Sequence, residues 1–484
     1  MEVGESHLLA KLKSRMQSGS LWALFGEVIS GGVRAVSYLV YARLLTPADF
    51  GLAGFALIIT SMFHLVVDNS LGLTVIRQAN EEPTVYSTIF FMNVGLSLCA
   101  VAALFALAPS AASFIHDDRM VYVLPIMSLQ LLANSLSSIP IAVARKRFLF
   151  KQLVPVRLAG SLMSLAIGIP LAIAGRGVWA LVGASVGVAV GQLIASLICL
   201  DWRPSWTFSL RGAQSVSKFA AWISVDMGVT WLVMSGGAFF LAFFLGAAKL
   251  GMFRLSDHLD AYLMGAILMP LIPVLYSSFC EVAERPEAYW KIFQRSSRVI
   301  TSISLGLGGI IIVAARPISR LIGGQWHGIA DILVLNAFAD AVSNVTMGIP
   351  ALMRATGRVK IVAAIRAATV IVQVIVYAKL APMGLKAFLL GKLSLESLIY
   401  VASFVVLRKS YNMPVKGVIR NQLGQVFFAS MCIVAAFVVL RYVAFVSQIE
   451  RLIVGVAVFF LSFGLYVLII ERKIITEVLG LQKV

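Results

Sequence analysis

Long apolar stretches alternate with short polar loops along almost the whole chain. A helix needs about 20 apolar residues to cross the hydrocarbon core of a bilayer. Stretches of this kind lie near residues 20–42, 50–72, 88–110, 120–143, 153–174, 178–200, 216–245, 252–279, 299–315, 329–352, 361–380, 385–407, 423–440 and 452–470. The splits at 174–178, 245–252 and 380–385 depend on very short loops. The pattern predicts an all-α integral membrane protein with about fourteen transmembrane helices.

Composition and charge place the same helices across a membrane. Of the 484 residues, 60% are hydrophobic and 13% are charged, a balance that soluble domains do not have. The even-numbered loops and the two termini hold 25 Lys and Arg residues, against 11 in the odd-numbered loops. Cytoplasmic loops carry the excess of Lys and Arg, so we expect both termini in the cytoplasm. The net charge of +18 is spread over many loops, which excludes the contiguous basic face of a nucleic-acid-binding protein.

The sequence predicts no cofactor, no metal site and no cleavable signal peptide. The first 19 residues are polar, and the first apolar run is long enough to span the membrane. The four cysteines are scattered along the chain, which gives neither a disulfide framework nor a metal-binding pattern. Loops of about twenty residues or fewer leave no room for a soluble catalytic domain.

A weak internal repeat divides the chain. Asn134 and Pro140 recur as Asn344 and Pro350 at an offset of 210 residues, and the run 45–51 matches 245–251 at an offset of 200. An offset of about six spans keeps both halves in the same orientation. The repeat predicts two parallel six-helix lobes, residues 1–212 and 213–410, around a central cavity. Residues 411–484, with the last two spans and a cytoplasmic tail, stand outside it.

Several spans carry polar and charged side chains at helical spacing. A charge inside a span costs about 2.5 kcal/mol or more, so it normally faces a partner or a wet cavity. Two interpretations stay open: buried ion pairs between helices, or the lining of a polar cavity. Lys392 and Glu396, four residues apart, fit a self-sufficient ion pair, and Arg119 and Arg176 fit plain loop charges. The stripes contain Glu27, Arg34, Tyr38, Asp68, Asp226, Arg254, Asp257, Asp260, Asn336, Asp340, Asn344 and Arg366.

The chemistry of these side chains narrows the cargo. The planar guanidinium of Arg suits phosphate oxygens, so an Arg in an opening helix of a lobe favours an anionic substrate. Carboxylates such as Asp68 or Asp340 can titrate or bind a cation when burial and neighbours tune them.

The run from Tyr41 to Gly54 resembles the stretch that joins the first two spans of polysaccharide-type flippases in the multidrug/oligosaccharidyl-lipid/polysaccharide (MOP) exporter superfamily. The segment Leu245–Arg254, the span with Pro270 and Pro273, and the run 284–286 resemble the start of the second lobe in these proteins. The resemblance covers essentially the whole chain, and the 41–54 run is its most distinctive part.

The resemblance implies a flippase that carries polyprenyl-pyrophosphate-linked oligosaccharide units across the bacterial inner membrane by alternating access, for exopolysaccharide, capsule or O-antigen synthesis. Its partners would be this lipid-linked cargo, the lipid bilayer, H⁺ or Na⁺, and the polysaccharide polymerase and export machinery. The candidate cavity residues for pyrophosphate and glycan are Arg34, Arg254, Arg366, Arg43, Tyr38 and Asn344. The candidates for ion coupling are Glu27, Asp68, Asp226, Asp257, Asp260 and Asp340.

Two alternatives remain at this point. A cation-coupled multidrug exporter of the same superfamily would need a net acidic and aromatic cavity, which the arginines at 34, 254 and 366 oppose. A membrane-embedded polysaccharide polymerase or ligase would need a sizeable external loop with reactive groups. The outer loops are short, although one of them holds His116, Asp117 and Asp118.

Overall fold

The structure is a computed structural model of the chain. It describes residues 26, 29–64, 71, 75, 83–147, 149–269, 271–282, 285–443, 445 and 447–470. All regular elements in this described part are helices, and twelve of them are long and apolar enough to cross a membrane. Contacts divide the chain into two compact units, residues 1–254 and 255–484. The all-α membrane fold is therefore confirmed, whereas the lobe boundaries expected from the repeat stay a prediction.

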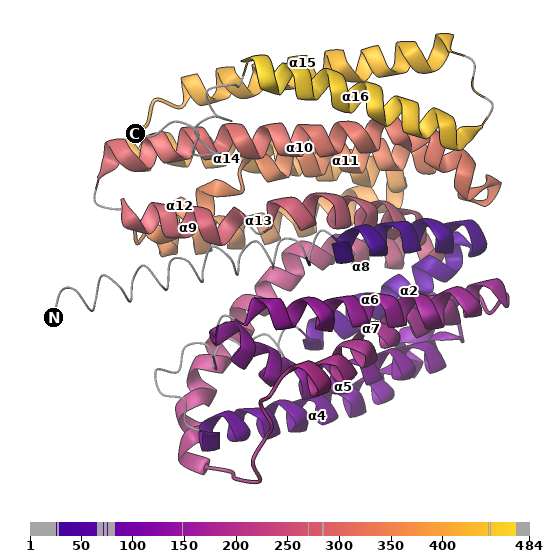
Figure 1. The fold of residues 1–484 in the computed structure, drawn as a ribbon, viewed down its shortest axis with the longest axis vertical. Helices are drawn as coiled ribbons and strands as arrows, with labels where there is room; N and C mark the ends of the chain where they lie inside the picture. Colours follow the sequence, from indigo (N-terminus) through magenta and orange to yellow (C-terminus); the bar gives the residue numbers. More distant parts are fainter. Residues whose placement is uncertain are drawn as a thin grey trace. The chain divides into compact units, whose positions relative to one another are not determined.

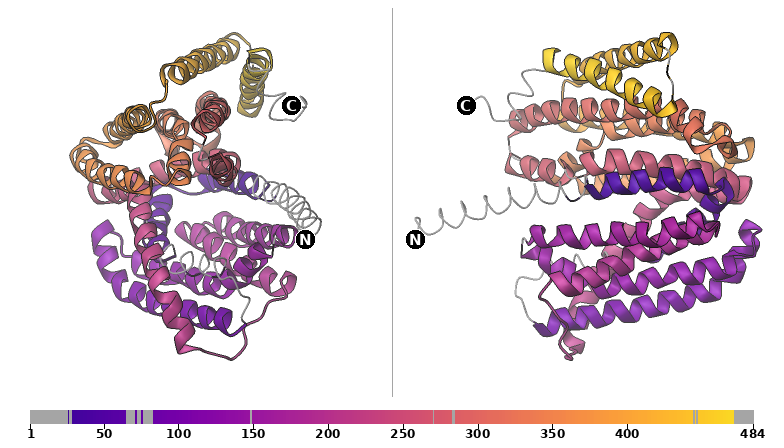
Figure 2. Two further views of the ribbon diagram at one scale, coloured as in Figure 1. Left: turned by 90° about the vertical axis from the view of Figure 1, so that its left-hand side faces the viewer. Right: turned by 45° about the vertical axis from the view of Figure 1, so that its right-hand side comes forward.

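Unit 1 begins with a helix whose described part covers residues 29–44. In Figures 1 and 2, α4 lies beside α5 and α6 lies beside α7, and these two pairs make the most extensive contacts of the unit. The later helices of the unit are α2 (Pro47–His64), α4 (Pro83–Ile115), α5 (Met120–Lys146), α6 (Phe150–Ile173), α7 (Val178–Cys199) and the first part of α8 (Leu210–Leu268).

Unit 2 contains the end of α8 and every later helix. Its elements are α9 (Leu271–Glu281), α10 (Pro286–Ile322), η2 (Gly324–Trp326), α11 (Ile329–Val345), α12 (Gly348–Ala355), α13 (Val359–Leu380), η3 (Ala381–Met383), α14 (Leu385–Tyr411), α15 (Lys416–Tyr442) and α16 (Gln448–Ile470). The C-terminal pair α15 and α16 packs on α10 (Figure 1). The ring of Phe459 fills the space beside Gly309, where a Cβ atom would lie only 2.1 Å from it.

The structure corrects one of the predicted span boundaries and refines another. The seventh and eighth spans are two helical parts of α8 that meet at Gly246, whose φ of 72° breaks the helix without a loop of several residues. The predicted span 252–279 is interrupted, since α8 ends at Leu268 and α9 begins at Leu271. The two other short splits are real, with a turn at 174–177 and the 3₁₀ helix η3 before α14.

The start of α2 is a capping box with proline in the first helical position. The backbone N–H of Asp49 donates to Thr46 Oγ1 at 3.3 Å, and the N–H of Thr46 donates to Asp49 Oδ2 at 3.2 Å. This reciprocal pattern satisfies two amide groups that a helix leaves free at its N-terminus. Pro47 needs no such partner, because it has no N–H and its φ already suits a helix. The Thr-Pro-Ala-Asp part of the run 41–54 is thus a helix start signal.

The carboxylate of Asp49 also joins the start of α2 to two other segments. Its Oδ1 accepts hydrogen bonds from the Val178 N–H at 3.1 Å and from Arg119 Nη1 at 3.2 Å. Arg119 pairs with Asp117 as well, at 2.7 Å. The interpretation of Arg119 as a plain loop charge is therefore wrong. The Arg119 guanidinium lowers the pKa of Asp117, and Asp117 in turn raises the pKa of Arg119.

The two matching runs of the repeat pack directly on each other. A Cβ atom at Gly51 would lie 1.7 Å from the carbonyl oxygen of Ala247, and one at Gly251 would lie 1.8 Å from that of Pro47. Since 247 and 251 are 47 and 51 shifted by 200 residues, the two contacts are mates of one another. Such reciprocity is typical of an interface around a two-fold axis. The contacts support the internal repeat and show why glycine recurs at its end.

Candidate functional site

A buried polar cluster in unit 2 joins α8, α11 and α14. Asn336 and Asp340 lie one turn apart on α11 and face Lys392 of α14. The Lys392 ammonium donates to Asp340 Oδ1 at 2.6 Å and to Asn336 Oδ1 at 2.8 Å. The side chains of Lys392 and Asp340 are only 13% and 24% exposed. A charged pair this deep is favourable only when hydrogen bonds satisfy both groups, as Asn336 helps to do here.

Asp260 extends the cluster onto α8. Its Oδ2 accepts a hydrogen bond from Asn336 Nδ2 at 2.6 Å, and the residue is 1% exposed. Its other carboxyl oxygen is buried and has no hydrogen-bond partner among the described residues. Asp257, about one turn earlier on α8, acts electrostatically on both Lys392 and Asp340. Asn336 Nδ2 also donates to Asp340 Oδ2 at 3.3 Å, so its amide bridges two carboxyl groups from different helices.

The hydrogen-bonded part of the cluster holds more carboxyl groups than ammonium groups among the described residues. Asp260 and Asp340 share the Asn336 amide, and Lys392 bonds only Asp340 of these two carboxyl groups. A buried carboxylate whose charge is not fully balanced by a cation is unfavourable by several kcal/mol. Binding of a proton or a cation removes this cost. This arrangement can therefore take up positive charge.

The expected ion pair of Lys392 with Glu396 is wrong as a self-sufficient unit. Lys392 is held from a second helix by Asp340 and Asn336. Glu396 lies one turn further along α14 and accepts a hydrogen bond from Ser343. Spacing of four residues predicted a pair within one helix, whereas packing of α14 on α11 provides partners across the interface.

The stripe on the first helix is divided between different surroundings. Arg34 and Tyr38 are half-buried, and the Tyr38 ring packs edge-on against Phe50 with centroids 5.9 Å apart. Tyr41 is buried, and its hydroxyl donates to the Ser164 carbonyl of α6 at 3.1 Å. Tyr41 thus belongs to helix packing. Arg43, at the end of the same helix, is exposed.

Arg254 lies on α8 where unit 1 ends and is 8% exposed. A Cβ atom at Gly54 would lie 2.8 Å from Arg254 Cγ, so the aliphatic part of the arginine rests on α2. This close approach needs glycine at position 54 and explains why the run 41–54 ends with one.

The remaining predicted residues lie in varied surroundings. Asp226 is exposed on α8, and Arg366 is half-buried on α13. Asn344 of α11 donates to the sulfur of Met264 at 3.2 Å. Glu27 and Asp68 lie outside the described residues.

The structure thus brings together three of the predicted residues, Asp257, Asp260 and Asp340. Arg34 and Arg254 belong to unit 1, and Arg366 belongs to unit 2. Sequence reasoning did not assign Asn336 or Lys392 to the site. The signal was present, because Asn336 shares a helical face with Asp340 and Lys392 is a rare charge inside a span.

Comparisons with known proteins agree with this architecture. The lipopolysaccharide biosynthesis protein WzxC of Escherichia coli K12 is 23% identical over 72% of this chain and 72% of its own length. The succinoglycan biosynthesis transport protein ExoT of Rhizobium meliloti is 20% identical over 66% of this chain and 65% of its own length.

Solved structures share the fold. The lipid II flippase MurJ in an inward closed conformation has a TM-score of 0.70, with 11% identity over 96% of this chain and 99% of its own. An inward-facing multidrug resistance MATE transporter of the MOP superfamily has a TM-score of 0.57, with 14% identity over 82% of this chain and 94% of its own. These likenesses confirm the predicted all-helical fold. Residues 40–331 match the family described as polysaccharide biosynthesis protein, and the chain belongs to that family.

Proposed function

We propose that the chain is a flippase for polyprenyl-pyrophosphate-linked oligosaccharide units that feed a surface polysaccharide. The observation that carries the proposal is the fold, which matches a lipid II flippase over 96% of the chain in a member of a polysaccharide biosynthesis family. The cargo of such a flippase combines a pyrophosphate, a glycan and a long lipid tail. We place the protein in the bacterial inner membrane with both termini in the cytoplasm, on the basis of the Lys and Arg distribution.

The arginines inside the spans are the proposed pyrophosphate ligands. Arg34, Arg254 and Arg366 carry permanent charges, and a guanidinium can hold two phosphate oxygens at once. Tyr38 and Asn344 are proposed to contact the glycan, and Arg43 to act at the membrane edge. Transport proceeds by alternating access, with polymerase and export machinery taking the product.

The acidic cluster of unit 2 is the proposed coupling site. Asp260 and Asp340 share the amide of Asn336, and Asp260 keeps a buried carboxyl oxygen without a partner among the described residues. Uptake of H⁺ or Na⁺ there would neutralise the excess negative charge. The replacement Asp260→Asn should uncouple transport from the ion gradient, which a counterflow assay in proteoliposomes with imposed H⁺ or Na⁺ gradients would reveal. Unchanged gradient dependence in this variant would remove the cluster from the mechanism.

The test of the function is mass spectrometry of lipids from cells depleted of the protein. We expect a polyprenyl-pyrophosphate oligosaccharide to accumulate while the surface polymer is lost. Complementation with Arg34→Ala or Arg254→Ala should fail although the variants reach the membrane, whereas Lys379→Ala should restore export. An unchanged lipid pool together with a gain in drug sensitivity would refute the proposal in favour of a multidrug exporter.

A further inference from the structure

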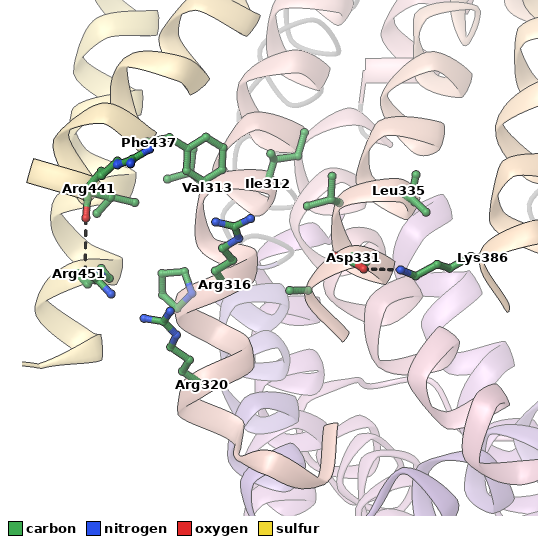
Figure 3. A pocket seen from close by; sticks show the side chains of 14 residues that line it. Ile312, Val313, Arg316, Arg320, Asp331, Leu335, Lys386, Phe437, Arg441 and Arg451 are labelled. Carbon is green, nitrogen blue, oxygen red and sulfur yellow. Dashed lines mark hydrogen bonds and ion pairs between the residues drawn. The ribbon is translucent and has the colours of Figure 1, made fainter. Parts of the chain in front are cut away.

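A pocket of about 870 Å³ opens in unit 2 where five helix ends meet. It is formed by the end of α10, the start of α11, the start of α14, the end of α15 and the start of α16. Its volume lies in the range of small-molecule binding sites, about 300–1,000 Å³. Figure 3 shows arginines of α10 on one wall and those of α15 and α16 on another. Its charged lining consists of Arg316, Arg320, Lys386, Arg441, Arg451 and Asp331.

The basic residues of this pocket lie on the side of the membrane where the sequence has few Lys and Arg residues. They lie in or next to the odd-numbered loops, which are poor in Lys and Arg. The ninth, eleventh and thirteenth loops and the helix ends beside them hold six basic residues, and all except Lys379 line the pocket. Topogenic charge would gather on the opposite side of the membrane. Membrane orientation therefore does not explain these charges. Their side chains line one pocket, which indicates a binding site for an anion.

The arginines of the pocket are short of acidic partners. Asp331, the one acidic residue of the lining, pairs with Lys386 at 2.6 Å. Among the described residues no carboxylate pairs with Arg316, Arg320 or Arg441. Arg451 donates to the Leu440 carbonyl at 3.5 Å, and its buried Nε has no partner in the described part of the chain. The pocket thus presents four guanidinium groups to an anion.

The rest of the lining identifies the kind of anion. Apolar side chains such as Val313, Leu335 and Phe437 complete the wall, and they suit an acyl chain. The lining contains no Ser, Thr, Asn, Gln, Tyr or Trp side chain. All but one of the charged groups in the lining are cationic, which favours a phosphate over a neutral glycan. Basic pockets between membrane helices bind anionic lipid head groups on the cytoplasmic side of membranes, and guanidinium groups offer a phosphate the same charge-assisted hydrogen bonds here.

We propose that this pocket binds the phosphate head group of an anionic phospholipid, with Arg316 and Arg320 on one side and Arg441 and Arg451 on the other. The proposal does not depend on the transported cargo. The orientation proposed above assigns the lipid to the outer leaflet.

The test is native mass spectrometry of the purified full-length protein titrated with phosphatidylglycerol. We expect phosphatidylglycerol to bind more tightly than phosphatidylethanolamine, and the double variant Arg316→Gln/Arg320→Gln to weaken it by about tenfold or more, since charge-assisted bonds are lost. Arg316→Lys/Arg320→Lys should retain most of the binding, and Lys379→Gln should bind as the wild type does. Thermal unfolding without added lipid checks that all variants are folded.

Two results would overturn the proposal. Equal phosphatidylglycerol binding by the wild type and the glutamine variant would show that the pocket is not the lipid site. Displacement of the lipid by equimolar inorganic phosphate or by polyprenyl pyrophosphate would assign the pocket to free phosphate or to the carrier lipid instead. Loss of glycan export with intact phosphatidylglycerol binding, or the reverse, separates this site from the transport function.

Discussion

Gly51 of α2 and Gly251 of α8 lie in a reciprocal close contact between these two helices. We expect a single added methyl group at this contact to lower the stability of the fold strongly. In Gly51→Ala the new Cβ would lie 1.7 Å from the carbonyl oxygen of Ala247. Ordinary contacts of a Cβ begin at 3.4 Å, and contacts below 3.0 Å are essentially never seen. The obstacle is backbone rather than a flexible side chain, so no rotamer change relieves it. The two segments must separate by more than about 1 Å.

The cost follows from overpacking and from the contacts that separation breaks. Overpacking a well-packed site costs typically 1–3 kcal/mol and occasionally more, and about 1.4 kcal/mol changes an equilibrium tenfold. Arg254 adds to the cost, because its aliphatic part rests on Gly54 one turn further along α2. We therefore expect Gly51→Ala to lower the folding equilibrium constant by about fivefold to 150-fold. Gly251→Ala should have the same effect, because its new Cβ would lie 1.8 Å from the carbonyl oxygen of Pro47.

The assay is thermal unfolding of the purified protein followed by size-exclusion chromatography, together with glycan export in cells. Gly95→Ala is the matched control, because a Cβ there meets nothing within 4 Å. It lies in a helix, where alanine is the better helix former. The control should be neutral or slightly stabilising. If Gly51→Ala and Gly251→Ala unfold like Gly95→Ala, the close approach of the two repeat runs is refuted.

Three further predictions follow from single contacts. Lys392→Met leaves the carboxylate of Asp340 buried without its ammonium and should destabilise by about 3–5 kcal/mol in thermal unfolding, whereas adding Asp340→Leu should recover most of this loss. Phe459→Ala, at a ring that is 1% exposed against α10, should cost about 3–5 kcal/mol, while exposed Phe460→Ala should have little effect. Since its arginine partner lowers the pKa of Asp117, that residue stabilises the fold above the ordinary aspartate pKa and loses this contribution as pH falls through the lowered value. Asp117→Asn should therefore lower the melting temperature slightly at neutral pH, and the difference should shrink below about pH 4.

The sequence predicted the helices well because their signal is local. Apolar runs of membrane-spanning length and the Lys and Arg bias need only composition in a window. The exceptions have physical reasons. Gly246 adopts a positive φ without penalty, so the chain bends within α8 where a polar loop was expected. The break between Leu268 and Leu271 occurs beside Pro270, a residue that cannot donate a helical hydrogen bond.

The site was predicted less well because it depends on which helices become neighbours. Helical spacing placed Lys392 and Glu396 on one face and so favoured a pair within α14. The observed partner of Lys392 lies 52 residues earlier in the chain, on α11. Likewise Asp49 marked a helix start in the sequence, yet nothing local predicted its hydrogen bond to Val178, 129 residues away. Periodicity in the sequence shows which side chains share one face of a helix. Only the packing of the fold shows which other helix that face contacts.

The internal repeat identifies the residues of unit 1 that correspond to the charged cluster of unit 2. At the offset of 200 residues Asp260 matches Thr60, and at the offset of 210 Asp340 matches Gln130. In unit 1 the amide of Gln130 donates to the Thr60 hydroxyl at 3.2 Å, which joins α2 to α5. In unit 2 the equivalent positions carry two carboxyl groups, joined through the Asn336 amide. The repeat therefore keeps a polar contact between corresponding helices but makes it neutral in one unit and acidic in the other. A neutral pair needs no counter-ion, whereas the acidic pair requires Lys392 and still leaves negative charge over. This difference is the physical reason to place ion coupling in unit 2, and it predicts no equivalent charge uptake at Thr60 and Gln130.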